Sequence, residues 1–272
     1  MDAGTAEPRL RDRVAVVTGG SRGIGRAIAL RLARDGAHCT ITYRRRDDAA
    51  EETVGAIEKQ GVQGLALPLD LAQPSDVRPV VDRIAERFGR VDILIASAAA
   101  TAFRPLAEQT ERNVRLTFAI SVDSFIALVR AAAPLMRAGA GRVVAISGID
   151  SVQAMRGHGV LGGAKAAVES LVRALALELG PDGITVNAVN PGFIATDSSR
   201  RYVERGLGAS YDEAVARLAR VTPVRRIGTV DDVADCVAWI VSDGAGFLTG
   251  QTIVLDGGLT IVSPLTRLED SS

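Results

Sequence analysis

The sequence predicts one doubly wound α/β domain, in which a seven-stranded parallel sheet carries helices on both faces. Short runs of β-branched and other apolar residues alternate with helical stretches from residue 13 to residue 256. The runs are apolar almost throughout, which is typical of strands buried on both faces of a parallel sheet. No linker rich in Pro, Gly or Ser interrupts the alternation. Because βαβ crossovers are right-handed, such a chain winds helices onto both sides of one sheet.

The alternation also gives approximate bounds for each element. Strands are expected near residues 13–18, 37–43, 63–68, 91–96, 142–147, 183–189 and 251–255. Helices are expected at about 23–35, 47–60, 74–88, 110–137, 160–180 and 230–242. The segment 197–222 is rich in arginine and has weaker periodicity, so we interpret it as a mobile substrate flap. We therefore expect a flexible N-terminus over residues 1–10, one domain over 11–262 and a loose tail over 263–272.

Composition argues against several classes of function. The chain has 32 Lys plus Arg and 32 Asp plus Glu, so it has no general electrostatic attraction to nucleic acid or to a membrane surface. Cys39 and Cys236 lie in apolar patterns without metal-ligand spacing, which predicts reduced core thiols and no metal site. No apolar run approaches the about 20 residues of a membrane span, and residues 1–13 lack the apolar core of a signal peptide. We expect a cytoplasmic protein.

Two helical segments, 114–136 and 161–179, are apolar nearly all round. A helix of this kind is buried on more than one side. We favour pairing of these helices between subunits, which predicts a homo-oligomer. The alternative is that the flap or a tail of the same chain covers the second face.

A glycine-rich turn follows the first strand. The segment from Thr18 to Gly25 reads Thr-Gly-Gly-Ser-Arg-Gly-Ile-Gly and leads into the first helix. Backbone N–H groups of such a turn, together with the positive end of the helix dipole, face a pyrophosphate. The spacing differs from the general Gly-x-Gly-x-x-Gly fingerprint, and the alternative is a tight turn without a ligand. Its position after the first strand favours a dinucleotide, with contacts from Gly19, Ser21, Arg22, Gly23, Ile24 and Gly25.

The end of the second strand indicates which dinucleotide binds. Arg44-Arg45-Arg46 follows the strand directly, where NAD-selective sites place a carboxylate for the ribose 2′-hydroxyl. A 2′-phosphate requires cations instead, and Arg22 at the mouth of the glycine turn reaches the same phosphate. Asp47 and Asp48 come later and fit the start of the next helix. The alternative is that the arginines are solvated surface charges. Together they favour NADP(H) as the cofactor.

Three further motifs accompany the glycine turn. They are Asp70-Leu71 after the third strand, Asn190-Pro191-Gly192 with Thr196 after the sixth, and Asp256-Gly257-Gly258 at the last. With them the chain resembles the short-chain dehydrogenase/reductase family over about residues 11–262. The resemblance implies a Rossmann-like fold and a homotetramer or homodimer.

The resemblance also assigns cofactor contacts. It implies that Asp70 and Leu71 contact adenine and that Ile194 and Thr196 hold the nicotinamide carboxamide. It implies that Lys165 binds the nicotinamide ribose. We place Ser97 and Ala98, in the loop after the fourth strand, among the cofactor contacts as well.

The catalytic positions depart from the pattern that the family shares. That pattern is an asparagine, a serine, a tyrosine and a lysine. In this chain the first three positions hold Ser121, Gly148 and Leu161, and only Lys165 remains. The chain has three tyrosines, and none lies near this motif in the sequence.

One branch of the family, the enoyl-acyl-carrier-protein reductases, spaces its tyrosine seven residues before the lysine. In this chain that position holds His158, and the segment 158–169 resembles the lysine helix of the branch. Reduction of an enoyl thioester puts negative charge on the thioester oxygen, which a well-placed N–H donor stabilises. A histidine supplies such a donor near neutral pH, so we predict that His158 and Lys165 are catalytic. The alternative is that His158 only begins the helix and faces solvent.

The loop after the fifth strand faces the cofactor by the rule for doubly wound sheets. Asp150 and Ser151 on this loop, with Phe193, are predicted to contact the substrate. Asp150 is also a candidate base, a candidate partner that orients His158, or simply a turn former.

Three functions fit these residues. The first is an NADPH-dependent reductase of an enoyl thioester, whose small-molecule substrate is bound to CoA or a carrier. The second is a ketoreductase of a specialised, polyketide-like pathway. The third is a catalytically silent NADP-binding subunit.

Overall fold

The computed structural model describes residues 9–136 and 139–263, and it confirms the predicted parallel sheet. Seven strands lie in the order β3-β2-β1-β4-β5-β6-β7, and each pairs with its neighbours in parallel. Every predicted strand forms with bounds within two residues of expectation, because each is a short apolar run bounded by turn residues. The strands are β1 (Val14–Thr18), β2 (His38–Tyr43), β3 (Gly64–Pro68), β4 (Ile93–Ala96), β5 (Arg142–Ile146), β6 (Thr185–Pro191) and β7 (Thr252–Leu255).

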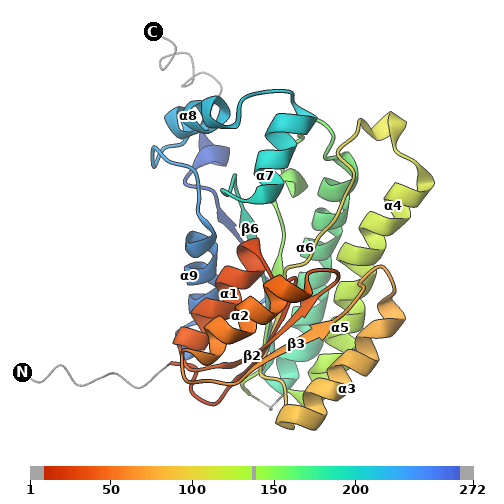
Figure 1. Cartoon of the computed structure of the whole chain (residues 1–272), viewed down its shortest axis with the longest axis vertical. Helices are drawn as coiled ribbons and strands as arrows, with labels where there is room; N and C mark the ends of the chain where they lie inside the picture. The colour runs from red at the N-terminus through yellow and green to blue at the C-terminus, as the bar shows by residue number, and fades with distance from the viewer. Residues whose placement is uncertain (1–8, 137–138, 264–272) are drawn as a thin grey trace, which may run out of the picture.

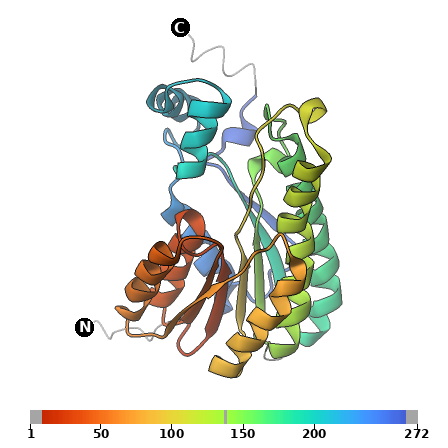
Figure 2. The same cartoon turned by 45° about the vertical axis from the view of Figure 1, so that its right-hand side comes forward.

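Helices cover both faces of the sheet, as Figures 1 and 2 show. On one face lie α1 (Gly23–Arg34), α2 (Asp47–Glu58) and α9 (Val230–Ile240), and α1 packs against α9. On the other lie α3 (Val77–Phe88), α4 (Glu111–Phe118), α5 (Ser124–Ala132) and α6 (Gly159–Leu179). Two apolar cores result, one between the sheet and each helical layer.

The long helix predicted over 110–137 is continuous, but its hydrogen bonding changes along its length. A π-helical segment, Ala119–Asp123, joins α4 to α5, and a short 3₁₀ segment, Ala133–Leu135, ends the run. Among the described residues, this run from Glu111 to Leu135 has the length and hydropathy of a membrane span. Half of its apolar window is buried inside the fold, which is the behaviour of a core helix.

The predicted flap is helical. It contains α7 (Asp197–Arg201), a π-helical segment (Tyr202–Gly206) and α8 (Tyr211–Val221), which lie above the carboxyl ends of the strands at the top of Figure 1. The sequence analysis missed these helices for two different reasons: α7 (Asp-Ser-Ser-Arg-Arg) contains no apolar residue, whereas α8 is amphipathic and its helical periodicity was overlooked. Tyr202 and Val203, between the two helices, are buried and anchor the flap to the domain. Its mobility remains a prediction.

The packed domain begins slightly earlier than expected. Residues 1–8, 137–138 and 264–272, including most of both predicted loose ends, lie outside the described residues. Leu10, however, is 1% exposed, and its N–H donates to the Asp35 carbonyl. The N-terminal boundary at residue 10 is therefore corrected, since Leu10 belongs to the core.

Candidate active site

A cavity of about 750 Å³ opens at the carboxyl ends of β1, β4, β5 and β6, beneath α7. This is where ligands bind in doubly wound sheets, because the connections diverge there. The cavity brings together the predicted site residues except Ser151. They are Gly19, Ser21, Arg22, Gly23, Ile24, Gly25, Arg44, Arg45, Asp70, Leu71, Ser97, Ala98, Asp150, His158, Lys165, Phe193, Ile194 and Thr196.

The glycine turn forms a tight cradle at one end of the cavity. A Cβ on Gly25 would lie 2.4 Å from the Gly19 carbonyl oxygen, so only glycine lets helix α1 start this close to the turn. The Thr18 hydroxyl oxygen accepts hydrogen bonds from the N–H groups of Ser97 (3.0 Å) and Ala98 (3.2 Å). These bonds fix the β4 loop beside the turn. The cradle fits a pyrophosphate at the N-terminus of α1.

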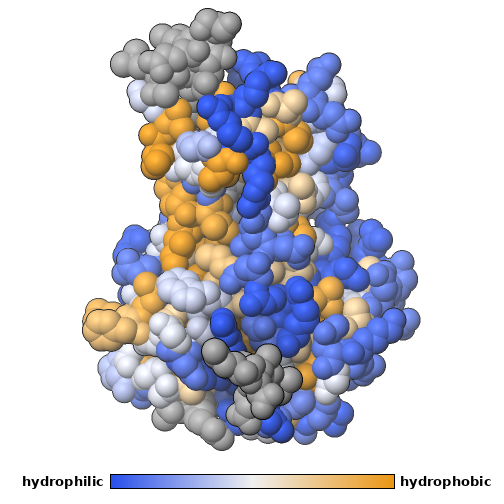
Figure 3. Space-filling view, turned by 90° about the vertical axis from the view of Figure 1, so that its left-hand side faces the viewer, coloured by the Kyte–Doolittle hydropathy of each residue, from blue (hydrophilic) through white to orange (hydrophobic). Residues whose placement is uncertain are grey.

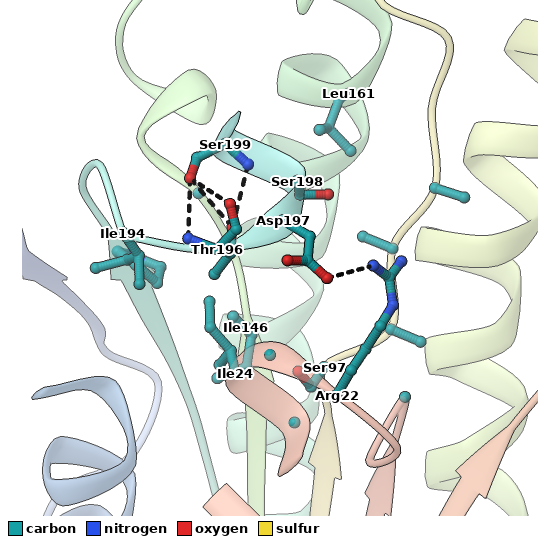
Figure 4. Close-up of a pocket in the computed structure, with 18 of the residues that line it drawn as sticks. Arg22, Ile24, Ser97, Ile146, Leu161, Ile194, Thr196, Asp197, Ser198 and Ser199 are labelled. Atoms are coloured by element: carbon teal, nitrogen blue, oxygen red, sulfur yellow. Dashed lines mark hydrogen bonds and ion pairs between the residues drawn. The ribbon is translucent and has the colours of Figure 1, made fainter. Parts of the chain in front are cut away.

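The arginines lie at the same end. Arg44 and Arg45 line the cavity and are exposed, so their guanidinium groups have access to a phosphate entering it. Asp47 and Asp48 lie in the first turn of α2, where the helix dipole stabilises their negative charge, as expected. Arg22 reaches across to the flap instead, and its Nη1 lies 3.6 Å from the Asp197 carboxylate (Figure 4). Its contact with a 2′-phosphate stays a prediction.

The flap end of the cavity is shaped by the start of α7. The Thr196 hydroxyl accepts a hydrogen bond from the Ser199 N–H at 3.1 Å, and the Ser199 side chain accepts from the Thr196 N–H (Figure 4). This reciprocal capping box fixes the first turn of α7. Ile194 is buried beside it, at 6% exposure. Both residues line the cavity, but their contact with a carboxamide stays a prediction.

Lys165 is buried on α6 and faces the cavity. Its Nζ donates a hydrogen bond to the Ile146 carbonyl oxygen at 2.6 Å, and the residue is 6% exposed. Burial lowers the pKa of the ammonium from 10.5 to about 8, although the charges of Asp150 and Glu169 act in the opposite direction. The ammonium therefore loses its proton closer to neutral pH than an exposed lysine does.

Ser151 does not contact the cavity, which corrects its predicted role in substrate binding. Its hydroxyl donates to the Glu169 carboxylate at 2.7 Å, and the same oxygen accepts from Ser147 (2.5 Å) and Asn190 (2.9 Å). Three donors thus satisfy one buried carboxylate oxygen, which explains why Ser151 turns inward. The sequence analysis missed Glu169. Its spacing of four residues from Lys165, which places both on one helix face, was the available signal.

His158 lies inside the site rather than in solvent. Its side chain is 12% exposed, and Nδ1 lies 3.0 Å from the carboxylate of Asp150, which is 6% exposed. Phe103 stacks on the imidazole with ring centroids 4.7 Å apart, and Tyr202 meets it edge to face at 4.3 Å. Nε2 is buried without a hydrogen-bond partner among the described residues. The alternative of a solvent-facing ring is therefore wrong.

Tyr202 and Phe103 are site residues that the sequence analysis missed. No tyrosine lies near His158 in the sequence, but the flap carries Tyr202 onto the imidazole, and its hydroxyl donates to the Arg156 carbonyl at 3.0 Å. Burial, followed by the charge of Asp150, raises the pKa of this hydroxyl, so it stays protonated near neutral pH. Leu161 extends from α6 toward the cavity (Figure 4), so this position supplies no proton donor.

Comparisons with known proteins agree on one family. The family model described as Enoyl-(Acyl carrier protein) reductase matches residues 19–260. The 1-cyclohexenylcarbonyl-CoA reductase of Streptomyces collinus is 41% identical over 254 residues, which cover 93% of this chain and 89% of that protein. The versicolorin reductase stcU of Emericella nidulans is 34% identical over 92% of this chain and 96% of that protein. 

A solved structure gives the same result. The short chain dehydrogenase from Burkholderia cenocepacia J2315, in complex with NADP, matches with a TM-score of 0.84 and 37% sequence identity. The match covers 93% of this chain and 99% of that one.

Proposed function

The chain belongs to the short-chain dehydrogenase/reductase family and is an NADP-dependent oxidoreductase, and from this premise we propose that it reduces the activated C=C bond of an enoyl thioester. The glycine cradle and the exposed Arg44 and Arg45 have the chemistry that a pyrophosphate and a 2′-phosphate require. We propose that Lys165, which lines the same cavity, binds the nicotinamide ribose. Bound NADPH supplies a hydride to the β-carbon of the substrate.

The observation that carries the proposal is the orientation of His158. One ring nitrogen is held by Asp150, and the other is buried without a partner among the described residues, in a side chain that lines the cavity. A buried, unpaired nitrogen is costly unless a ligand atom completes it. The oxygen of an enoyl thioester, on which negative charge develops, is such an atom. After hydride addition the ring donates its Nε2 proton to the enolate and is left neutral, which balances one hydride with one proton.

The surroundings of the imidazole suit a hydrocarbon acyl group. Phe103, Met155, Leu161 and Tyr202 line the cavity with His158. An apolar lining with few polar groups binds an apolar ligand and fixes its orientation through those groups. The Streptomyces collinus relative is named as a reductase of a cyclic unsaturated acyl-CoA. We therefore propose a cyclic or branched enoyl-CoA as the substrate class, and 1-cyclohexenylcarbonyl-CoA as the first probe.

The experiment measures NADPH oxidation with this probe, with crotonyl-CoA and with a panel of ketones. The variant His158→Ala is expected to lose about 100-fold or more in kcat with an enoyl-CoA while its NADPH affinity is unchanged. The matched control is His38→Ala, because the other histidine begins β2 at the amino end of the sheet. Full activity of His158→Ala would remove the imidazole from the mechanism.

Ketone reduction is the second candidate, since the versicolorin reductase is also a relative. Turnover of ketones with enoyl-CoA left untouched would establish it. Tight NADPH binding without turnover of any panel member would favour a silent subunit.

We also propose that the protein is a homo-oligomer. Within the chain, α5 and α6 bury much of their apolar surface against the sheet. Large exposed apolar side chains remain at Leu116 on α4 and Leu177 on α6, and also at Trp239 on α9, at Phe247 in the loop that follows, and at Val254 on the edge strand β7. The face on the α9 side carries a broad apolar band (Figure 3). A second copy of the chain is the proposed occupant, and light scattering of the purified protein measures the oligomeric state.

A further inference from the structure

We propose that Asp150 is the positioning residue of this site: its carboxylate fills the room that a side chain at position 148 would need, and it holds the His158 ring so that Nε2 meets the substrate. The inference deepens the proposed function and rests on the role given there to His158. It implies that the two departures from the family pattern are linked: glycine in place of serine at 148 leaves room for the Asp150 carboxylate, and that carboxylate holds the histidine at 158.

The space around Asp150 is made by two glycines. Gly148 has an extended backbone with φ of −175°, which any residue adopts, so its conformation does not require glycine. A Cβ there would lie 2.7 Å from Asp150 Oδ1, which is closer than real contacts of this kind. A Cβ on Gly162 would lie 2.3 Å from the Asp150 carbonyl oxygen. The first turns of α6 therefore pack directly on the backbone of Asp150. The Asp150 carboxylate occupies the space that a side chain at position 148 would take.

The hydrogen bond fixes the form of the imidazole. An ionised carboxylate only accepts, so the proton between the two groups belongs to His158 Nδ1. Nε2 is then an acceptor in the neutral ring and a donor in the charged ring. Enolate stabilisation requires the charged form, whose positive charge is balanced by the buried Asp150 at 3.0 Å. Other ionisable groups on the packed elements include Tyr202 on the flap and Lys165 and Glu169 on α6. The pKa values of Tyr202 and Lys165 both respond to the charge of Asp150.

Nuclear magnetic resonance tests this assignment without any substrate. The chain has two histidines, and His38 is an internal reference because its Nδ1 accepts a hydrogen bond from the Gln63 N–H at 3.1 Å. The two rings therefore differ at Nδ1. A long-range ¹H–¹⁵N correlation of the ¹⁵N-labelled protein is expected to show a protonated Nδ1 in His158 and an unprotonated Nδ1 in His38. The variant His38→Gln assigns the signals.

One variant removes the carboxylate of Asp150, and a second variant displaces it. Asp150→Ala is expected to abolish the fixed Nδ1 proton of His158 and to leave His38 unchanged, which also reports that the fold is intact. Gly148→Ser keeps Asp150 but displaces its carboxylate, so the same change at His158 is expected. Gly163→Ser is the matched control, because a Cβ there meets nothing within 4 Å. An unchanged His158 pattern in both Asp150→Ala and Gly148→Ser would overturn the proposal, as would an unprotonated Nδ1 in the unaltered protein.

Kinetics separate positioning from a merely structural role. Asp150→Asn keeps an oxygen acceptor and removes the charge, so kcat with 1-cyclohexenylcarbonyl-CoA is expected to fall by at least about 10-fold while KM for NADPH is unchanged. Combined with His158→Ala, it is expected to add no further loss, because the two residues act as one unit. Independent, additive losses would contradict the proposal. If no enoyl thioester is turned over, the proposed function fails, and the resonance experiment still decides the role of Asp150.

Discussion

The buried ammonium of Lys165 makes a quantitative prediction about stability at alkaline pH. Burial lowers its pKa from 10.5 to about 8 in the folded protein. In the unfolded chain the group is solvated and titrates at its ordinary value. Between these two values the unfolded chain binds a proton that the folded protein has released. By linkage, the free energy of unfolding that Lys165 contributes rises as the pH increases through this window, and is lost again as the pH falls toward 8.

The magnitude follows from the two pKa values. The difference between 10.5 and about 8 corresponds to about 3 kcal/mol, since one pKa unit is about 1.4 kcal/mol. Other groups titrate in the same range with the opposite effect. Burial raises the pKa of the Cys39 thiol from 9.0 to about 12, which makes its contribution to stability fall as the pH rises. A comparison with a variant is therefore needed to isolate the lysine.

The assay is urea denaturation of the cofactor-free protein and of Lys165→Met at several pH values between 7.5 and 10.5. The unfolding free energy of the unaltered protein minus that of the variant is expected to increase by about 3 kcal/mol across the window. Lys59, the only other lysine in the chain, is exposed on the surface, so Lys59→Met is the matched control, whose difference should stay constant. A Lys165 difference that stays constant, or that decreases with pH, would refute the buried-ammonium argument.

Two further predictions concern the cofactor. Replacing both Arg44 and Arg45 by Glu is expected to weaken NADPH binding by about 10- to 100-fold, since a hydrogen bond to a charged group contributes about 1.5–3 kcal/mol. NADH binding should change much less, and equal losses for both cofactors in fluorescence titrations would contradict the 2′-phosphate assignment. Gly25→Ala is expected to weaken NADPH binding by at least about 10-fold, because its Cβ would lie 2.4 Å from the Gly19 carbonyl oxygen. Unchanged affinity would show that the cradle tolerates a side chain.

The features that were predicted well from the sequence are those that depend on residues close together in the chain. The strands are short apolar runs, and the glycine turn is a contiguous motif whose place after β1 determines its role. The spacing of seven residues between His158 and Lys165 is also local. About two helical turns separate the two positions, so both reach the same cavity. Sequence alone sufficed for these features because neighbouring residues determine them.

The parts that it missed depend on contacts between distant segments. The edge-to-face contact of Tyr202 with His158 exists only because the flap packs on the segment that precedes α6, and no pattern in the flap encodes that contact. The position of Ser151 on a loop that faces the cofactor predicts a substrate contact. Its hydroxyl turns to Glu169 because a buried carboxylate must be satisfied by donors from three elements. The need to give every buried polar group a hydrogen-bond partner involves the whole packed interior, so it determines side-chain orientations that a local sequence pattern does not show.

The position of the proposed donor, His158, at the N-cap of α6 bears on which bond is reduced. Residues 158, 161 and 165 line the cavity, and the only ring nitrogen among them is at 158. Moving the donor from position 161 to position 158 shifts it about 4.5 Å along a helix axis, away from the lysine. In a ketone the oxygen is bonded to the carbon that accepts the hydride. In an enoyl thioester the oxygen lies three bonds from the carbon that accepts the hydride, two bonds farther than in a ketone. A donor displaced from the lysine therefore matches the conjugated substrate better than the ketone. The imidazole position therefore favours conjugate reduction, independently of the identity of the relatives.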